Sequence, residues 1–323
     1  MTEHPQKLDD LSHDLSGVSR EILVNDRVIQ QYDEQYLQSA SDPSLPWQRC
    51  GSVVTQEAIE NGLLLVCENA FVELRWFAPK ILRVRVQPSS NDFSNYFSYY
   101  VDPDLQAQVV DLRIREMNDQ INIRVDDHQY SIDKATTRIT CYNEDNQIVF
   151  TTADSAAWRE DGQCGMIAKM HPSEASYGTG ERAFNLNLRG RQVAMWNTDP
   201  GGYHRGDDPV NYCVSYYLGV HDHAAYGLLW DNPSRGVFDI GATEPDKLQI
   251  TAEVGQLCYY LFAGDDVNDV MAQYTTITGR MPLPPLWALG YQQCRYSYES
   301  EVETLEVAQK LRELKIPCDA IYL

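Results

Sequence analysis

The chain has 323 residues, of which 43% are hydrophobic and 23% are charged. This is the composition of a folded globular protein with enough apolar side chains for a sizeable core, and the length suggests roughly one or two domains. With 26 Lys and Arg against 47 Asp and Glu, the formal net charge of −21 argues against nucleic acid and anionic lipid as partners, because both bind positively charged surfaces.

Between residues 21 and about 265 the apolar residues recur with a period of two. Val72, Leu74 and Trp76 alternate with charged residues, and similar alternation recurs in residues 82–86, 121–125 and 130–132. Each run fits a strand with one buried face, and turn-forming residues separate the runs. Residues 21–280 are therefore predicted to form a large antiparallel β-sandwich. The polar residues 1–20 before it lack a clear apolar period and are predicted to be a mobile lead.

The sequence changes character after about residue 265. Residues 265–274 are predicted to form a short helix, because the acidic residues at its start suit a helix N-terminus. Pro282, Pro284 and Pro285 then predict a stiff linker, since proline restricts the backbone. A second domain is accordingly predicted to begin at residue 281.

Residues 281–323 have the pattern of a strand, a helix and a second strand. Buried strands are predicted for residues 286–294 and 318–323, and a capping box of Ser300 and Glu303 opens the helix between them. The predicted apolar stripe of this helix consists of Val302, Leu305, Ala308, Leu311 and Leu314. The pattern is the opening unit of a parallel α/β fold. Because a closed (β/α)₈ barrel takes roughly 250 residues, this segment is predicted to be the truncated start of one.

The motif Tyr177-Gly-Thr-Gly-Glu-Arg182 is rich in glycine but is not predicted to bind phosphate. It lacks the Gly-Lys-Ser/Thr ending of a phosphate loop. Its glycines are instead expected to allow a tight turn of a strand. Glu181 and Arg182 are expected to form a structural ion pair.

Two other polar patterns also have structural interpretations. His221-Asp-His223 resembles a pair of metal ligands, but no third ligand lies nearby in the sequence, so a solvated hairpin turn is expected. Asp207 and Asp208 are interpreted as loop charge. No metal site is predicted.

Three stretches in the second half of the chain carry motifs that gain weight from their order. The first stretch contains Tyr177-Gly-Thr-Gly-Glu-Arg182 and Trp196-Asn-Thr-Asp199. The second contains Ala225-Tyr-Gly-Leu-Leu-Trp-Asp-Asn-Pro-Ser-Arg235 and Phe238-Asp239. The third contains Tyr274-Thr-Thr-Ile-Thr-Gly-Arg280, Pro285-Leu-Trp-Ala-Leu-Gly290, Cys294-Arg-Tyr-Ser-Tyr298 and Ile316-Pro-Cys-Asp-Ala-Ile-Tyr-Leu323. In this order and spacing they resemble family 31 of the glycoside hydrolases, the α-glucosidase and α-xylosidase family. Residues 21–170 match that family only in being rich in β-structure.

The resemblance implies a galactose-mutarotase-like β-sandwich followed by a (β/α)₈ barrel. It also implies a retaining α-glycosidase that hydrolyses terminal α-linked glucose or related sugars with two carboxylates, about 5–5.5 Å apart, and without a metal or organic cofactor. Both carboxylates are expected beyond Leu323, so the chain as given is expected to be inactive. The implied partner is an α-linked oligosaccharide or glycoside.

Four residues match positions that line the sugar site in the family. The resemblance implies that Asp199 reaches over the barrel mouth to the sugar, and a carboxylate suits the binding of vicinal hydroxyl groups. It implies that Tyr296 lines the sugar pocket, with Asn197 and Arg295 as neighbouring candidates. The structural alternatives are an Asx turn at Asp199 and simple packing of Tyr296 between barrel and sandwich.

Other functions remain open at this point. The chain could be a stand-alone carbohydrate-binding or interaction module, although residues 281–323 would then expose an apolar stripe and unpaired strand edges. An aldose epimerase is suggested by the sandwich type alone, which does not define a function. Within the resembled family, transglycosylation and lyase chemistry are alternatives to hydrolysis.

The cysteines and the N-terminal sequence bear on the compartment. The 8 cysteines are widely scattered, without a Cys-x-x-Cys pair, so free buried thiols are expected. The first ten residues are polar and lack the apolar core of a secretory signal, and apolar runs such as residues 63–67 are too short to span a membrane. A cytoplasmic protein without a membrane span is therefore predicted.

Overall fold

The computed structural model describes residues 44–94, 97–102, 104–105, 107–126, 128–222 and 224–323. The predicted polar lead, residues 1–20, lies outside these ranges, as does the stretch that follows it up to residue 43. The chain separates into two compact units, Met1–Thr278 and Gly279–Leu323.

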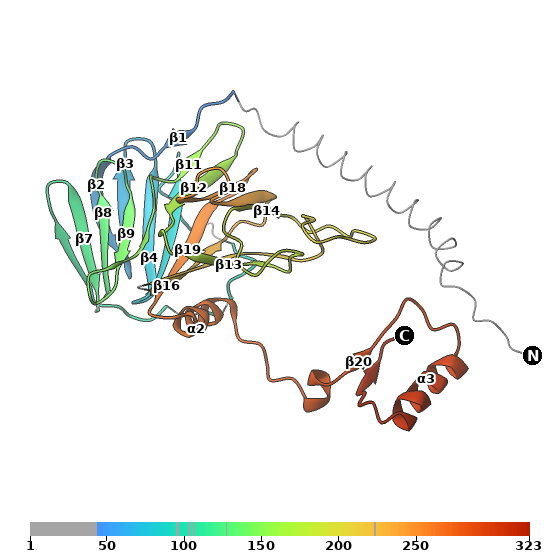
Figure 1. Cartoon of the computed structure of the whole chain (residues 1–323). Helices are drawn as coiled ribbons and strands as arrows, with labels where there is room; N and C mark the ends of the chain where they lie inside the picture. The colour runs from blue at the N-terminus through green and yellow to red at the C-terminus, as the bar shows by residue number, and fades with distance from the viewer. Residues whose placement is uncertain (1–43, 95–96, 103, 106, 127, 223) are drawn as a thin grey trace, which may run out of the picture. The chain divides into compact units, whose positions relative to one another are not determined.

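Three antiparallel sheets build the larger unit (Figure 1). The eight-stranded sheet has the order β13 (Ala175–Gly180), β15 (Cys213–His221), β16 (Ala224–Trp230), β19 (Leu257–Gly264), β5 (Ile81–Gln87), β4 (Phe71–Ala78), β3 (Gly62–Cys67) and β2 (Val53–Ile59). The six-stranded sheet has the order β1 (Gln48–Arg49), β11 (Ala157–Trp158), β12 (Cys164–Lys169), β18 (Lys247–Ala252), β17 (Gly236–Ile240) and β14 (Arg191–Met195). The five-stranded sheet has the order β10 (Ile148–Thr151), β9 (Ile139–Tyr142), β8 (His128–Asp133), β7 (Gln120–Val125) and β6 (Leu112–Glu116). The predicted mainly-β, antiparallel fold is confirmed.

The main hydrophobic core includes residues from one face of the eight-stranded sheet and from both other sheets. Val72, Leu74 and Trp76 of β4 belong to it and are at most 3% exposed. The other two sheets contribute residues such as Ile121 and Ile250. The predicted two-residue period is therefore the pattern of the core face, as expected for strands.

The opposite face of the eight-stranded sheet is also largely buried, which the alternation did not predict. Arg83 and Arg85 of β5 belong to this face and are 6% and 4% exposed. The helix α2 (Val267–Thr278) packs on β16 and β19, with Val270 and Ile277 in a second apolar cluster. The helix α2 therefore covers part of the sheet face that the alternating sequence pattern predicted to be exposed to solvent.

The predicted helix over residues 265–274 corresponds to α2 but is shifted towards the C-terminus. The side chain of Asp266 accepts a hydrogen bond from the amide of Asp269 at 2.9 Å, so it acts as a cap in front of the helix. The helix continues to Thr278 because Ile277 still contributes to the buried apolar cluster. Apolar burial thus extends the helix beyond the predicted end.

The smaller unit is a strand, a helix and a strand, as predicted for the start of a barrel. β20 (Gln292–Gln293) pairs in parallel with β21 (Ala320–Ile321), and α3 (Glu301–Glu313) lies between them in the sequence. The prediction of one buried strand over residues 286–294 is wrong, because Leu286–Leu289 forms a 3₁₀ helix, η1. Strand pairing needs a partner, and among the described residues β21 pairs with β20 over only two positions.

The capping of α3 agrees with the sequence, but its buried side does not. The Ser300 hydroxyl accepts a hydrogen bond from the Glu303 amide at 3.2 Å, as in a capping box. Along the predicted stripe, however, Val302, Leu305 and Leu314 are 65%, 59% and 57% exposed. Two strands of two residues each offer too little surface to cover a full apolar stripe.

Candidate functional site

The predicted sugar contact Asp199 lies on a long connection between β14 and β15, residues 196–212, here called the Asp199 loop. Side chains and backbone hold this loop against the sheet. Asn197 Oδ1 accepts a hydrogen bond from the Cys213 amide at 2.7 Å, and the Thr198 amide donates to the Val210 carbonyl at 3.1 Å. Asn197 thus anchors the loop, and its predicted contact with sugar stays a prediction.

A buried ion pair between Arg182 and Asp208 fastens the Asp199 loop. Asp208 Oδ1 pairs with the Arg182 guanidinium, and the two side chains are only 14% and 3% exposed. Asp208 Oδ2 also accepts a hydrogen bond from the Ala194 amide at 2.6 Å. Arg182 in turn donates to the carbonyls of Ala194, at 2.8 Å, and Thr179, at 3.0 Å. The strand end before the loop and the end of the loop are thereby joined.

This ion pair corrects two sequence interpretations. Arg182 was expected to pair with Glu181, and Asp208 was expected to be loop charge, yet the two residues bind each other. Burial raises the pKa of the Asp208 carboxyl, while the Ala194 amide and the Arg182 guanidinium oppose that rise. The residues lie 26 positions apart, so local sequence spacing contained no signal for their contact.

Asp199 itself is exposed, and its loop also carries three aromatic residues with exposed surface. Asn211 Nδ2 donates to Asp199 Oδ1 at the long distance of 3.4 Å, which leaves the carboxylate available to a ligand. Trp196, Tyr203 and Tyr212 of the same loop are 40%, 57% and 53% exposed. A carboxylate can bind sugar hydroxyl groups, and an exposed aromatic ring can stack against the apolar face of a sugar.

The glycines of the motif at residues 177–182 serve the backbone, as predicted. Gly178 and Gly180 have φ values of 99° and 94°, in the left-handed region that favours glycine. At Gly180 a Cβ atom would lie 2.6 Å from the Tyr212 carbonyl oxygen and 2.7 Å from the Cys213 Cα. The register of β13 against β15 shifts between Gly178 and Gly180. The motif is therefore a β-bulge at the base of the Asp199 loop.

Replacement of Gly180 by alanine should lower the free energy of unfolding by roughly 1–3 kcal/mol, because the residue would be both strained and in contact with backbone. Urea unfolding of the variant measures this change. Gly202→Ala is the matched control, since nothing lies within 4 Å of the added Cβ. Equal stability of both variants would contradict the proposed backbone role.

The other two predicted site residues lie in the smaller unit. Tyr296 is fully exposed and follows β20 by three residues. The Arg295 guanidinium pairs with Glu303 of α3 and lies 4.6 Å from the centre of the Tyr298 ring. Arg295 therefore links the strand end to the helix, whereas Tyr296 presents its ring to a ligand or to other protein surface.

Several other site types find no support in the described part of the chain. There, no group of three or more His, Cys, Asp or Glu side chains could hold a metal ion. His221 ends β15 in a hairpin with β16 and stacks on His171 with 4.9 Å between ring centres. Among the described residues, no helix has the length and apolar character needed to span a bilayer.

The chain thus combines an antiparallel β-sandwich, a loop with an exposed carboxylate and exposed aromatic rings, and a parallel strand–helix–strand unit. The profile of the glycosyl hydrolase 31 N-terminal galactose mutarotase-like domain matches residues 72–239. The profile of the glycosyl hydrolases family 31 TIM-barrel domain matches residues 281–323. The chain belongs to glycoside hydrolase family 31.

Sequence and structure similarities to individual proteins are consistent with this family. The chain is 32% identical to alpha-glucosidase 2 of Bacillus thermoamyloliquefaciens, over 84% of this chain and 34% of that protein. It is 41% identical to an alpha-xylosidase of Saccharolobus solfataricus, over 48% of this chain and 20% of the relative. A Flavobacterium johnsoniae GH31 dextranase, solved in complex with isomaltotriose, has a TM-score of 0.77 at 26% identity, over 85% of this chain and 34% of that one. The chain thus spans about a third or less of these relatives.

Proposed function

We propose that this chain is the N-terminal portion of a retaining α-glycosidase, and that its Asp199 loop contributes to binding an α-linked glucoside or related sugar. The observation that carries the proposal is the construction of the loop. A buried ion pair fastens its base, while Asp199 and three aromatic rings remain exposed. A site that must hold a ligand needs this combination of a rigid support and free binding groups.

The similar proteins support the proposed substrate class. They include α-glucosidases, α-xylosidases and a dextranase in complex with isomaltotriose. We assign catalysis to two carboxylates in a barrel portion beyond Leu323. Residues 281–323, which match the TIM-barrel profile, correspond to the start of that barrel.

Hydrolysis assays with α-glucosides and α-xylosides test the proposal on the complete protein that contains this chain, with the 323-residue chain as the control. We expect the complete protein to cleave at least one of these substrates and the chain alone to cleave none. Activity of the chain alone, or absence of cleavage by the complete protein, would contradict the proposal. Improved solubility with retained sugar binding on deletion of residues 281–323 would favour the stand-alone module instead.

The exposed apolar residues of the smaller unit argue against a stand-alone module. Met281, Leu283 and Leu286 are 82%, 92% and 86% exposed in this chain. Burial of such side chains is a strong driving force for further packing. The further strands and helices of a (β/α)₈ barrel would provide such packing.

Replacement of Tyr296 by alanine in the complete protein should lower kcat/KM by roughly two- to tenfold. An aromatic contact contributes about 0.5–1.5 kcal/mol, and the exposed ring is available for such a contact. Steady-state kinetics with the best substrate measures the change. Tyr296→Phe serves as the control and should retain most of the activity if the ring surface is what matters. An unchanged kcat/KM in Tyr296→Ala would remove this residue from the sugar site.

We also infer a cytoplasmic location. All 8 cysteines carry free thiols, and burial raises the pKa of Cys50 to about 11 and that of Cys67 to about 12. Free thiols are typical of proteins in a reducing compartment. Fractionation of the native cells with detection of the protein tests this inference, and recovery outside the cytoplasmic fraction would contradict it.

A further inference from the structure

A hollow on the outer face of the eight-stranded sheet concentrates positive charge in a chain that is otherwise strongly acidic. It has a volume of about 540 Å³ and includes Glu73, Arg75, Arg83 and Arg85 in its lining. The described lining residues thus carry three guanidinium groups against one carboxylate, whereas the whole chain has 47 acidic and 26 basic residues. The hollow is here called the arginine hollow.

The strand register brings these charges together. In the antiparallel pairing of β4 with β5, Glu73 lies opposite Arg85, and Arg75 lies directly opposite Arg83. Like charges at directly opposed positions destabilise a sheet. Among the residues that line the hollow, Glu73 supplies the one carboxylate close to these three cations.

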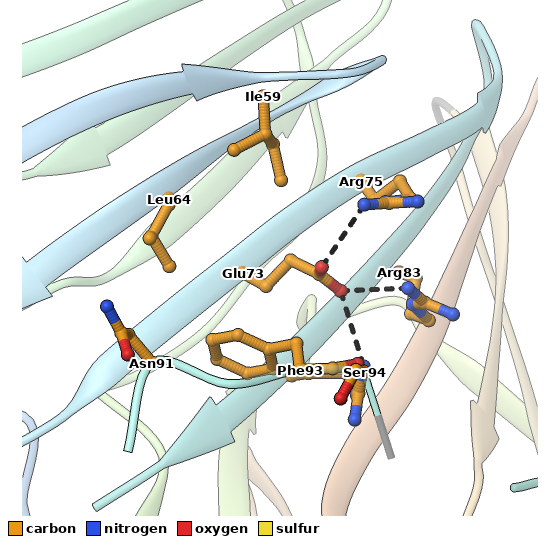
Figure 2. Close-up of a pocket in the computed structure, with 9 residues that line it drawn as sticks. Ile59, Leu64, Glu73, Arg75, Arg83, Asn91, Phe93 and Ser94 are labelled. Carbon is orange, nitrogen blue, oxygen red and sulfur yellow. Dashed lines mark hydrogen bonds and ion pairs between the residues drawn. The ribbon is translucent and has the colours of Figure 1, made fainter. Parts of the chain in front are cut away.

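Figure 2 shows the Glu73 carboxylate between Arg75 and Arg83. Glu73 Oε1 lies 2.8 Å from Arg83 Nη2 and 3.7 Å from Arg85 Nη1, and Glu73 Oε2 lies 3.4 Å from Arg75 Nη2. The Arg85 guanidinium also donates to the Phe93 carbonyl at 2.8 Å. Glu73 thus holds Arg83 by the shortest contact, the Phe93 carbonyl holds Arg85, and Arg75 has a 3.4 Å contact with Glu73.

Arg75 is also the accessible member of the cluster. Its side chain is 33% exposed, against 8% for Arg83, 5% for Arg85 and 5% for Glu73. The buried guanidinium groups of Arg83 and Arg85 raise the positive potential in the hollow, because charges interact more strongly where water is excluded. Arg75 is therefore positioned to make the direct contact with a ligand that enters the hollow.

The other walls indicate the size and character of that ligand. Ile59, Leu64 and Phe93 supply apolar surface around the charged floor. A volume of about 540 Å³ lies in the range of small-molecule sites and exceeds what a single inorganic ion needs. The planar guanidinium group binds carboxylate and phosphate oxygens through paired hydrogen bonds.

We propose that the arginine hollow is a binding site for a small organic anion, whose carboxylate or phosphate group contacts Arg75 and whose remaining atoms lie against Ile59, Leu64 and Phe93. Glu73 is a positioning residue that holds Arg83 and Arg85 beneath the anion. The site lies on the sandwich and is built from β2, β3, β4, β5 and the segment after β5. It does not depend on the proposed glycosidase activity.

Isothermal titration of the 323-residue chain at constant ionic strength tests this proposal with four probes. Glucose 6-phosphate and inorganic phosphate represent phosphate groups, glucuronate represents carboxylates, and glucose is the neutral control. We expect at least one organic anion to bind with a Kd of about 1 mM or tighter, and more tightly than glucose. The preferred probe distinguishes phosphate from carboxylate. Absence of binding by both organic anions would overturn the proposal. Binding that Asp199→Ala weakens and Arg75→Ala does not would also overturn it, because that binding would belong to the Asp199 loop.

Two variants locate the binding. Arg75→Ala should weaken the affinity of the best probe by roughly ten- to a hundredfold, the change expected for loss of a charged hydrogen bond. Asn91→Asp is the second variant, because Asn91 lines the hollow on an exposed loop and its replacement adds a negative charge with little risk to folding. It should weaken binding about tenfold or more. The matched control Asn118→Asp changes another exposed asparagine outside the hollow and should bind like the wild type. Equal affinity in Asn91→Asp and Asn118→Asp would place the anion elsewhere and overturn the assignment.

Discussion

Replacement of Arg182 by alanine is expected to lower the free energy of unfolding by about 3–5 kcal/mol, because it leaves the carboxylate of Asp208 buried without its ionic partner. The same change removes the hydrogen bonds from Arg182 to the Thr179 and Ala194 carbonyls. The Asp199 loop should then lose its fixed position. Chemical unfolding measures the stability, and hydrogen exchange of residues 196–212 measures the loop.

The pH dependence separates this mechanism from a general loss of packing. Burial already raises the pKa of Asp208, and loss of Arg182 removes a group that opposes the rise. When folding raises the pKa of a carboxyl, the protonated carboxyl contributes to the free energy of unfolding at low pH. This contribution is lost as the pH rises through the pKa that the carboxyl has in the folded state. The deficit of Arg182→Ala should therefore be larger at pH 8 than at pH 5.

Two controls accompany this experiment. Arg113→Ala removes an ion pair with Asp111 whose side chains are 75% and 64% exposed, and it should change stability little, because exposed pairs contribute little. The double variant Arg182→Ala/Asp208→Asn removes the unpaired charge and should recover part of the lost stability. A deficit that is independent of pH and unaffected by Asp208→Asn would show that the charge is not the cause.

Replacement of Asp199 by alanine in the complete protein should lower kcat/KM by about ten- to a hundredfold while leaving the thermal stability unchanged. Loss of a charge-assisted hydrogen bond to sugar hydroxyl groups corresponds to roughly 1.5–3 kcal/mol. Stability should not change, because Asp199 is exposed and has only the 3.4 Å contact from Asn211. Steady-state kinetics and a thermal melt measure the two effects.

Matched variants make the Asp199 result specific. Asp145→Ala removes another exposed carboxylate, in the turn between β9 and β10, and should keep full activity. Asp199→Asn keeps the shape of the side chain but not its charge and should lie between the wild type and Asp199→Ala. Unchanged kcat/KM in Asp199→Ala would leave Asp199 as a structural loop residue.

The elements that local sequence predicts are those whose structure depends on near neighbours. The alternation around Val72, Leu74 and Trp76 identifies a strand because period two follows from the pleat. The capping box of Ser300 and Glu303 identifies the start of α3 because its hydrogen bond closes within three residues. The glycines at residues 178 and 180 indicate a backbone role because their φ values are rarely open to other residues.

The features that sequence did not predict depend on contacts between distant segments. Arg182 meets Asp208 across 26 positions, and the three arginines of the arginine hollow meet only after β4 pairs with β5. Residues 286–294 have the composition of a strand, yet strand structure requires a partner, and in the described chain it is limited to Gln292–Gln293. The candidate residue Asp199 came from the family resemblance, and the exposed aromatic rings of its loop became evident from the structure.

The central proposal is that this chain is the N-terminal portion of a retaining α-glycosidase. Proton NMR of the first sugar released from an α-glucoside or α-xyloside by the complete protein tests it most directly. Two successive displacements retain the configuration, so the account predicts that the α-anomer appears first and then mutarotates. Initial release of the β-anomer, or no release of sugar from either substrate, would contradict it.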